Sequence, residues 1–244
     1  MVCVSYWGRD GVWVWEPPQN VWRNLMLPFA CAGDPEAAQY PDAGNELDSL
    51  ALAVSGGRVV LAAGGDEQGV AFWDVDTGEL INGTSFNGLY IAAVAALDGG
   101  DGSTRFVTCS GVHWDGIMVW EPVAGSSPVG LPESTVDAIG VGRFEGRSLV
   151  VAGTREDVTL WDVDSRERWA SSLYTEDEND DGEDTGDERM HAVAIAQQGS
   201  GLAVVALTDS GSVRVWTLPS PRPVRTDREL AVELHIHVGH CRCR

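Results

Sequence analysis

The segment that decides the fold is VVLAAGGDEQGVAFWD, residues 59–74. Its first half is a run of branched and small apolar residues, and its middle is polar and rich in Gly and Asp. Its second half alternates in character and ends at Trp73 and Asp74. β-branched and aromatic residues favour strands, and a short polar turn between two such runs favours a hairpin. The segment therefore predicts two antiparallel strands, the second of which ends on a tryptophan.

The same unit occurs five times along the chain. Its copies occupy residues 2–16, 59–74, 106–121, 149–162 and 203–217. A tryptophan stands near the end of each copy: Trp15, Trp73, Trp120, Trp161 and Trp216. Successive tryptophans are 58, 47, 41 and 55 residues apart. Without the Pro/Gly-rich residues 28–45 and the acidic residues 176–188, the two long gaps shrink to 40 and 42 residues. A period of about 40 to 47 residues is that of a four-stranded propeller blade.

Other strands complete each repeat. A short segment of small and branched residues precedes four of the hairpins, at residues 47–54, 90–97, 136–142 and 190–196. Small residues suit the innermost strand of a blade, where neighbouring blades converge. A polar turn and a further strand follow the tryptophans, and no segment has a sustained helical period. The sequence predicts an all-β protein, a β-propeller of about five recognisable four-stranded blades.

Two copies carry a family resemblance. Residues 70–78 (VAFWDVDTG) and 158–164 (VTLWDVD) resemble the WD40 repeat, and the likeness, which is to divergent bacterial-type WD40 proteins, extends over almost the whole chain. It implies that Asp10, Asp115 and Asp157 are structural turn residues that accept hydrogen bonds from local backbone amides. The Gly-His dipeptide typical of the family occurs only at residues 239–240. We therefore expect its Trp-His-Asp network to be incomplete in most blades.

The strand count leaves two alternatives for how the ring closes. The chain opens on the second strand of a blade, so one strand is missing from five complete blades. Either residues 233–240 supply the closing strand of a five-bladed ring, or the chain is an incomplete part of a larger, seven-bladed propeller. An unpaired strand edge promotes aggregation, so an unclosed ring needs a partner or a cover.

Composition limits the partners. The formal net charge is −21, and the 16 Lys and Arg residues are dispersed. This field disfavours nucleic acid and anionic membrane surfaces and favours a protein or peptide with a basic surface. The sequence has no run of 18 apolar residues and no secretory signal, and its five cysteines are scattered. These features predict one cytoplasmic domain over residues 1–244. The oligomeric state stays open.

Two segments contain metal-ligating residue types. The acidic run matches a calcium loop at Asp177, Asn179, Asp181 and Glu188. Because acids dominate residues 176–188 and no helices flank them, we favour a solvated, disordered inter-strand loop. A second cluster, with zinc-ligating side chains, comprises His235, His237, Cys241 and Cys243. Its spacing matches no standard zinc motif, so we expect no cofactor and a frayed tail at residues 241–244.

No nucleophile with a base and no phosphate-binding loop is recognisable. We therefore predict a non-enzymatic scaffold that binds a protein or peptide on one face of the propeller. Its candidate contact residues lie in hairpin turns: Trp7, Arg9, Asp10, Asp66, Glu67, His113, Trp114 and Asp115. One alternative is an enzyme or a small-molecule or metal sensor that uses Asp48, Asp137 and His191 at a central channel. Another is that the chain is a truncated fragment of a larger WD40 protein.

Overall fold

The computed structural model describes residues 2–5, 12–16, 20–25, 47–65, 69–84, 91–110, 116–133, 135–154, 157–170 and 189–218. Its regular structure there consists of 18 strands in five antiparallel sheets. This confirms the prediction of an all-β fold. Within the same residues, no helix has the length and apolar character needed to cross a membrane.

Each sheet is formed by strands that are consecutive in the chain. The first and fifth sheets have three strands each: β1 (Val2–Ser5), β2 (Val12–Glu16), β3 (Val21–Leu25); β16 (Met190–Gln198), β17 (Gly201–Thr208), β18 (Val213–Leu218). The second, third and fourth have four strands each: β4 (Leu47–Ser55), β5 (Arg58–Gly65), β6 (Gly69–Asp74), β7 (Leu80–Thr84); β8 (Ala93–Asp98), β9 (Thr104–Cys109), β10 (Ile117–Trp120), β11 (Val129–Leu131); β12 (Val136–Phe144), β13 (Arg147–Thr154), β14 (Val158–Asp162), β15 (Glu167–Ala170).

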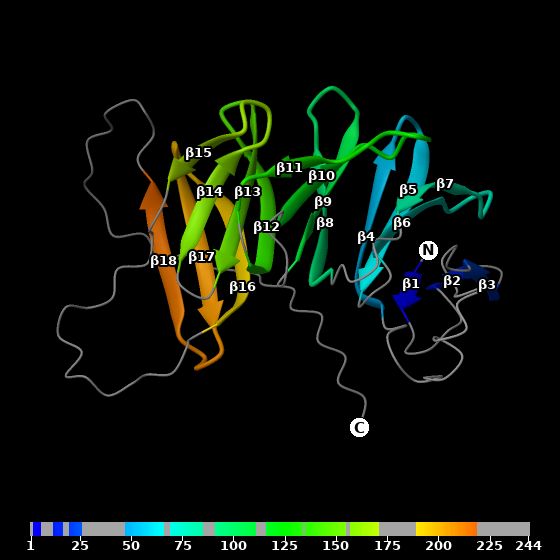
Figure 1. The fold of residues 1–244 in the computed structure, drawn as a ribbon, viewed down its shortest axis with the longest axis horizontal. Helices are drawn as coiled ribbons and strands as arrows, with labels where there is room; N and C mark the ends of the chain where they lie inside the picture. Colours follow the sequence, from blue (N-terminus) through cyan, green and yellow to red (C-terminus); the bar gives the residue numbers. More distant parts are fainter. Residues whose placement is uncertain are drawn as a thin grey trace.

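The sheets stand side by side in chain order (Figure 1). Neighbouring sheets meet through their first strands, since β4 contacts β8, β8 contacts β12 and β12 contacts β16. These strands carry small residues because their backbones approach closely. A Cβ atom added at Gly140 of β12 would lie 2.7 Å from the carbonyl oxygen of Val193 in β16. The small-residue segments of the sequence are therefore the strands along which the sheets converge.

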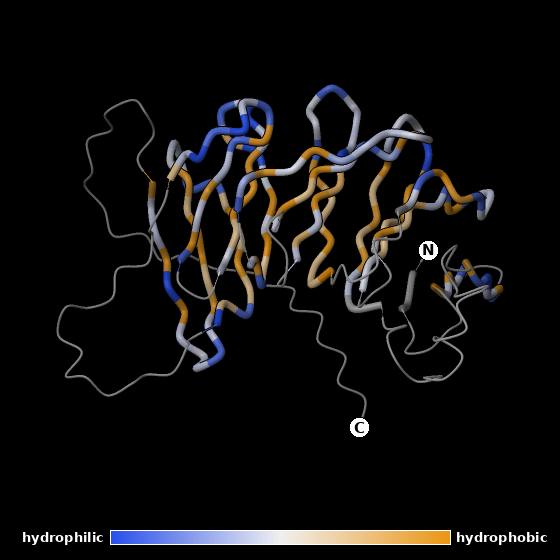
Figure 2. Tube along the Cα trace, viewed as in Figure 1, coloured by the Kyte–Doolittle hydropathy of each residue, from blue (hydrophilic) through white to orange (hydrophobic). Residues whose placement is uncertain are grey.

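The apolar core lies between the sheets. Apolar residues follow the strands, whereas hydrophilic residues gather at the turns (Figure 2). Four buried clusters fill the four interfaces between successive sheets; three contain a repeat tryptophan (Trp73, Trp120 or Trp161), and the partly buried Trp216 packs against the fourth. Each cluster also contains two apolar side chains of the preceding sheet, at the positions one and three residues before that sheet's own tryptophan.

The two end sheets differ from the expected four-stranded pattern. Trp15 lies on the second strand of the first sheet, whereas the other repeat tryptophans lie on the third strand of theirs. The first sheet thus lacks the equivalent of a first strand, and the fifth lacks the equivalent of a fourth, within the described residues. These two sheets lie at opposite ends of the row (Figure 1).

Substitution of Phe72 tests how much the packing between the second and third sheets stabilises the fold. It is fully buried, and its ring centroid lies 5.4 Å from that of Phe106 and 5.7 Å from that of Trp120. Phe72→Ala should lower the free energy of unfolding by about 3–5 kcal/mol, because it removes a large buried side chain and leaves a cavity. Urea unfolding measures this. The matched control, Val54→Ala at an exposed position of β4, should change it by less than about 0.5 kcal/mol.

Candidate functional site

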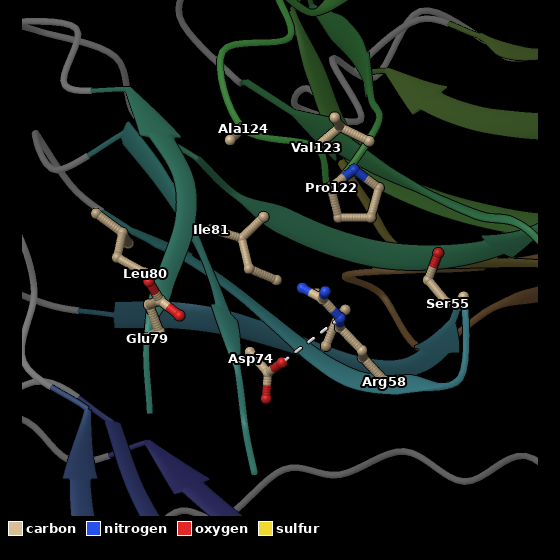
Figure 3. Close-up of a pocket in the computed structure, with 11 residues that line it drawn as sticks. Ser55, Arg58, Asp74, Glu79, Leu80, Ile81, Pro122, Val123 and Ala124 are labelled. Carbon is tan, nitrogen blue, oxygen red and sulfur yellow. Dashed lines mark ion pairs between the residues drawn. The ribbon is translucent and has the colours of Figure 1, made fainter. Parts of the chain in front are cut away.

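A pocket of about 460 Å³ opens between the second and third sheets. One side is formed by the β4–β5 hairpin and by the β6–β7 turn with the start of β7. The other side is the loop of Pro122, Val123 and Ala124, which follows β10 (Figure 3). Leu80 and Val123 are large apolar residues that remain exposed at this pocket. The pocket therefore combines an accessible apolar surface with the charged groups described next.

The charged part of the pocket is organised by Asp74, the acidic residue after Trp73. Its Oδ1 accepts hydrogen bonds from the backbone amides of Asp76 (3.0 Å) and Thr77 (3.1 Å). The Thr77 amide bond is the main cause that lowers the pKa of Asp74 below its ordinary value of 3.8, and burial opposes it. The other carboxylate oxygen lies 3.9 Å from Nε of Arg58 (Figure 3). Asp74 is thus a fixed negative charge that shapes the β6–β7 turn.

The opposite wall is held in place by Asn82 of β7. Its Nδ2 group donates to the carbonyl oxygens of Val123 and Ser126, each at 3.1 Å. The Ser126 hydroxyl donates in turn to the carbonyl oxygens of Glu121 (2.7 Å) and Val123 (2.9 Å). The loop is therefore tied both to itself and to the neighbouring sheet. A preformed wall reduces the entropy lost when a ligand binds.

The repeat tryptophans use different hydrogen-bond partners. The indole nitrogen of Trp120 donates to Thr108 Oγ1 at 2.9 Å, and that of Trp15 donates to Asn20 Oδ1 at 3.2 Å. Trp161 donates to the buried carboxylate of Glu133 at 3.1 Å. That carboxylate also accepts bonds from Thr159 (2.8 Å) and Arg168 (3.1 Å). Glu133 lies between β11 and β12, so this network links the third sheet to the fourth.

Only one of the three predicted turn aspartates lies in the described residues. Asp157, in the β13–β14 turn, accepts a hydrogen bond at 2.7 Å from the backbone amide of Val158. The other two aspartates, the candidate contact residues and the candidate metal ligands lie outside the described residues: Asp10, Asp115, Trp7, Arg9, Asp66, Glu67, His113, Trp114, Asp177, Asn179, Asp181, Glu188, His235, His237, Cys241 and Cys243.

The proposed channel residues occupy equivalent places in three sheets. Asp48, Asp137 and His191 each fall at a register shift between the first and second strands, in β4, β12 and β16. Nδ1 of His191 lies 3.6 Å from Oδ1 of Asp209, which is in the turn between β17 and β18. The part of the chain that the structure describes contains no group of three or more His, Cys, Asp or Glu residues that could hold a metal ion.

The pocket residues were missed by reasoning from sequence. The sequence around Asp74 could have indicated its role in a turn, because Asp74 follows a repeat tryptophan and precedes Thr77 and Gly78. No sequence motif marks Val123 or Asn82, since their role depends on the packing of two sheets. Glu133 also has no local motif.

The comparisons support the fold and identify no family. No family model and no curated protein matches the chain. Solved structures do match, among them U3-55K, a WD40 protein, with a TM-score of 0.57 and 17% identity over 86% of this chain. The computationally designed Ika8 protein matches with a TM-score of 0.55 and 17% identity, also over 86% of this chain. The matches cover 57% and 53% of those chains, so this chain spans about half of their length.

The lowered pKa of Asp74 predicts a pH-dependent contribution to stability. A carboxyl whose pKa is lowered by folding stabilises the folded state above its unfolded pKa, and this stability is lost as the pH falls through the folded pKa. Wild type should therefore be more stable than Asp74→Asn at pH 7, and the difference should disappear as the pH falls below about 3.8. Unfolding by urea across this range measures it. Parallel stability profiles for the two proteins would contradict this role of Asp74.

Proposed function

We propose that this chain is a WD40-like protein-interaction module without catalytic activity, and that its sheets are blades forming an open arc of a β-propeller. The chain-ordered row of antiparallel sheets and the likeness to U3-55K support this architecture. The cytoplasmic location belongs to the same proposal and is supported by the scattered cysteines, of which Cys109 is buried and free.

We further infer that the pocket between the second and third sheets binds a segment of a partner protein. The carrying observation is the combination of exposed Leu80 and Val123 with charged Asp74, Glu79 and Arg58 in one pocket. An apolar side chain of the ligand would lie against Leu80 and Val123. A Lys or Arg beside it would lie near Glu79, and the net charge of −21 would attract the same ligand over longer distances.

The alternative of a channel enzyme or sensor has weaker support. His191 lies close to Asp209 in the β17–β18 turn, which gives it a structural partner there. The pocket, in contrast, has accessible apolar walls from two sheets, and apolar grooves are a common way to bind the apolar residues of a protein segment. An interaction module is therefore the function that the geometry supports better.

Selection of peptides from a random displayed library against the purified protein tests this proposal. Selected peptides should contain an apolar residue next to Lys or Arg, and fluorescence anisotropy should show weaker binding at higher salt. Leu80→Ala combined with Val123→Ala should weaken binding at least about tenfold, equivalent to about 1.4 kcal/mol, because the apolar contacts are lost.

The matched control is Leu52→Ala, at an exposed apolar position of β4 outside the pocket, which should leave the affinity unchanged. Peptides that bind wild type and the Leu80/Val123 double variant equally would place recognition elsewhere and contradict the pocket. Failure of a folded protein to select any peptide would contradict the function itself.

A further inference from the structure

A repeated pair of side chains joins each sheet to the next. The pair stands one and three residues before the repeat tryptophan in all five sheets: Val12 and Val14, Val70 and Phe72, Ile117 and Val119, Val158 and Leu160, Val213 and Val215. In the first four sheets the pair is buried in a cluster that includes the tryptophan of the following sheet or, in the case of Trp216, that this tryptophan packs against. The contact is therefore directional, from the pair of one sheet to the tryptophan of the next.

The fifth sheet carries the same pair without this cover. Val213 and Val215 are 58% and 54% exposed, whereas the equivalent Val158 and Leu160 are fully buried. The strand registers show that the positions match. Val215 is paired with Val205 of β17, as Leu160 is paired with Val151 of β13. Two apolar side chains, equivalent to the pairs that are buried at all four interfaces within the chain, are thus exposed to solvent.

The first sheet exposes tryptophan side chains, which are the other partner in this kind of contact. Val12 and Val14 face the second sheet, so Trp15, which alternates with them on β2, lies on the other face. Trp22 is directly opposite Trp15 on β3, and the two rings stack with centroids 5.9 Å apart. Trp22 is 52% exposed. One end of the row therefore offers tryptophans and the other offers a valine pair.

We propose that the fifth sheet of one copy binds the first sheet of a second copy, with Trp15 and Trp22 packed on Val213 and Val215. The contact repeats the one found four times within the chain. A second copy is the occupant that fits, because the first and fifth sheets of a single copy lie at opposite ends of the row (Figure 1). Such a head-to-tail contact is heterologous and leaves one free end of each kind in a dimer.

Sedimentation velocity between about 1 and 100 µM tests the proposal. Wild type should associate as its concentration rises. Val215→Asp and Trp22→Asp should each raise the dissociation constant at least about tenfold, because each would place a charge in an apolar contact. Both residues are exposed, so urea unfolding midpoints close to that of wild type would show that the variants fold. The control, Val54→Asp at an exposed position of β4, should associate as wild type does.

Mixing the two variants gives the sharper result. Each retains one intact end, so Val215→Asp and Trp22→Asp should form a dimer of one copy of each, although neither associates alone. Wild type that is monomeric at all these concentrations would overturn the proposal, as would association that Val215→Asp leaves unchanged. A mixture that stays monomeric while wild type associates would overturn the pairing of these two faces. Peptide binding by monomeric Val215→Asp would show that the pocket function stands independently of this contact.

Discussion

The packing of a tryptophan from one sheet on an apolar pair from the preceding sheet is the interaction on which the structure depends. It occurs at all four interfaces between successive sheets. A sheet of three or four strands cannot bury both faces alone, so its stability comes from its neighbours. The first strands can then approach closely enough to require glycine at position 140. The fold is therefore a series of similar contacts between sheets. The outer face of the first and of the fifth sheet lacks such a contact among the described residues.

Polar groups adapt to this packing instead of determining it. Trp120 donates to a threonine, Trp161 to a glutamate and Trp15 to an asparagine. At the interfaces that contain Trp120 and Trp161 the apolar contact is retained while the hydrogen-bond partner changes. The same freedom permits local specialisation. Between the second and third sheets, Asn82 fixes a loop that forms one wall of the proposed binding pocket.

The periodic part of the structure was predictable, and the part that depends on packing between sheets was not. The sequence of residues 59–74 predicts two strands joined by a turn, and the structure forms β5 and β6 there. The positions one and three residues before each tryptophan are also visible in sequence. Glu133 was missed because its partners, Thr159 and Trp161, are more than 25 residues away. Val213 and Val215 resemble the other pairs in sequence, and only the structure distinguishes them by exposure.

Hydrogen exchange of β14 and β18, followed by mass spectrometry, tests the central claim most directly. The two strands carry equivalent apolar pairs, and only that of β14 is covered by a following sheet. In dilute protein, backbone amides of β18 should exchange much faster than those of β14, and of these two strands only β18 should exchange more slowly at high protein concentration. Equal protection of both strands at every concentration would contradict the account, because the fifth sheet would then have no uncovered face.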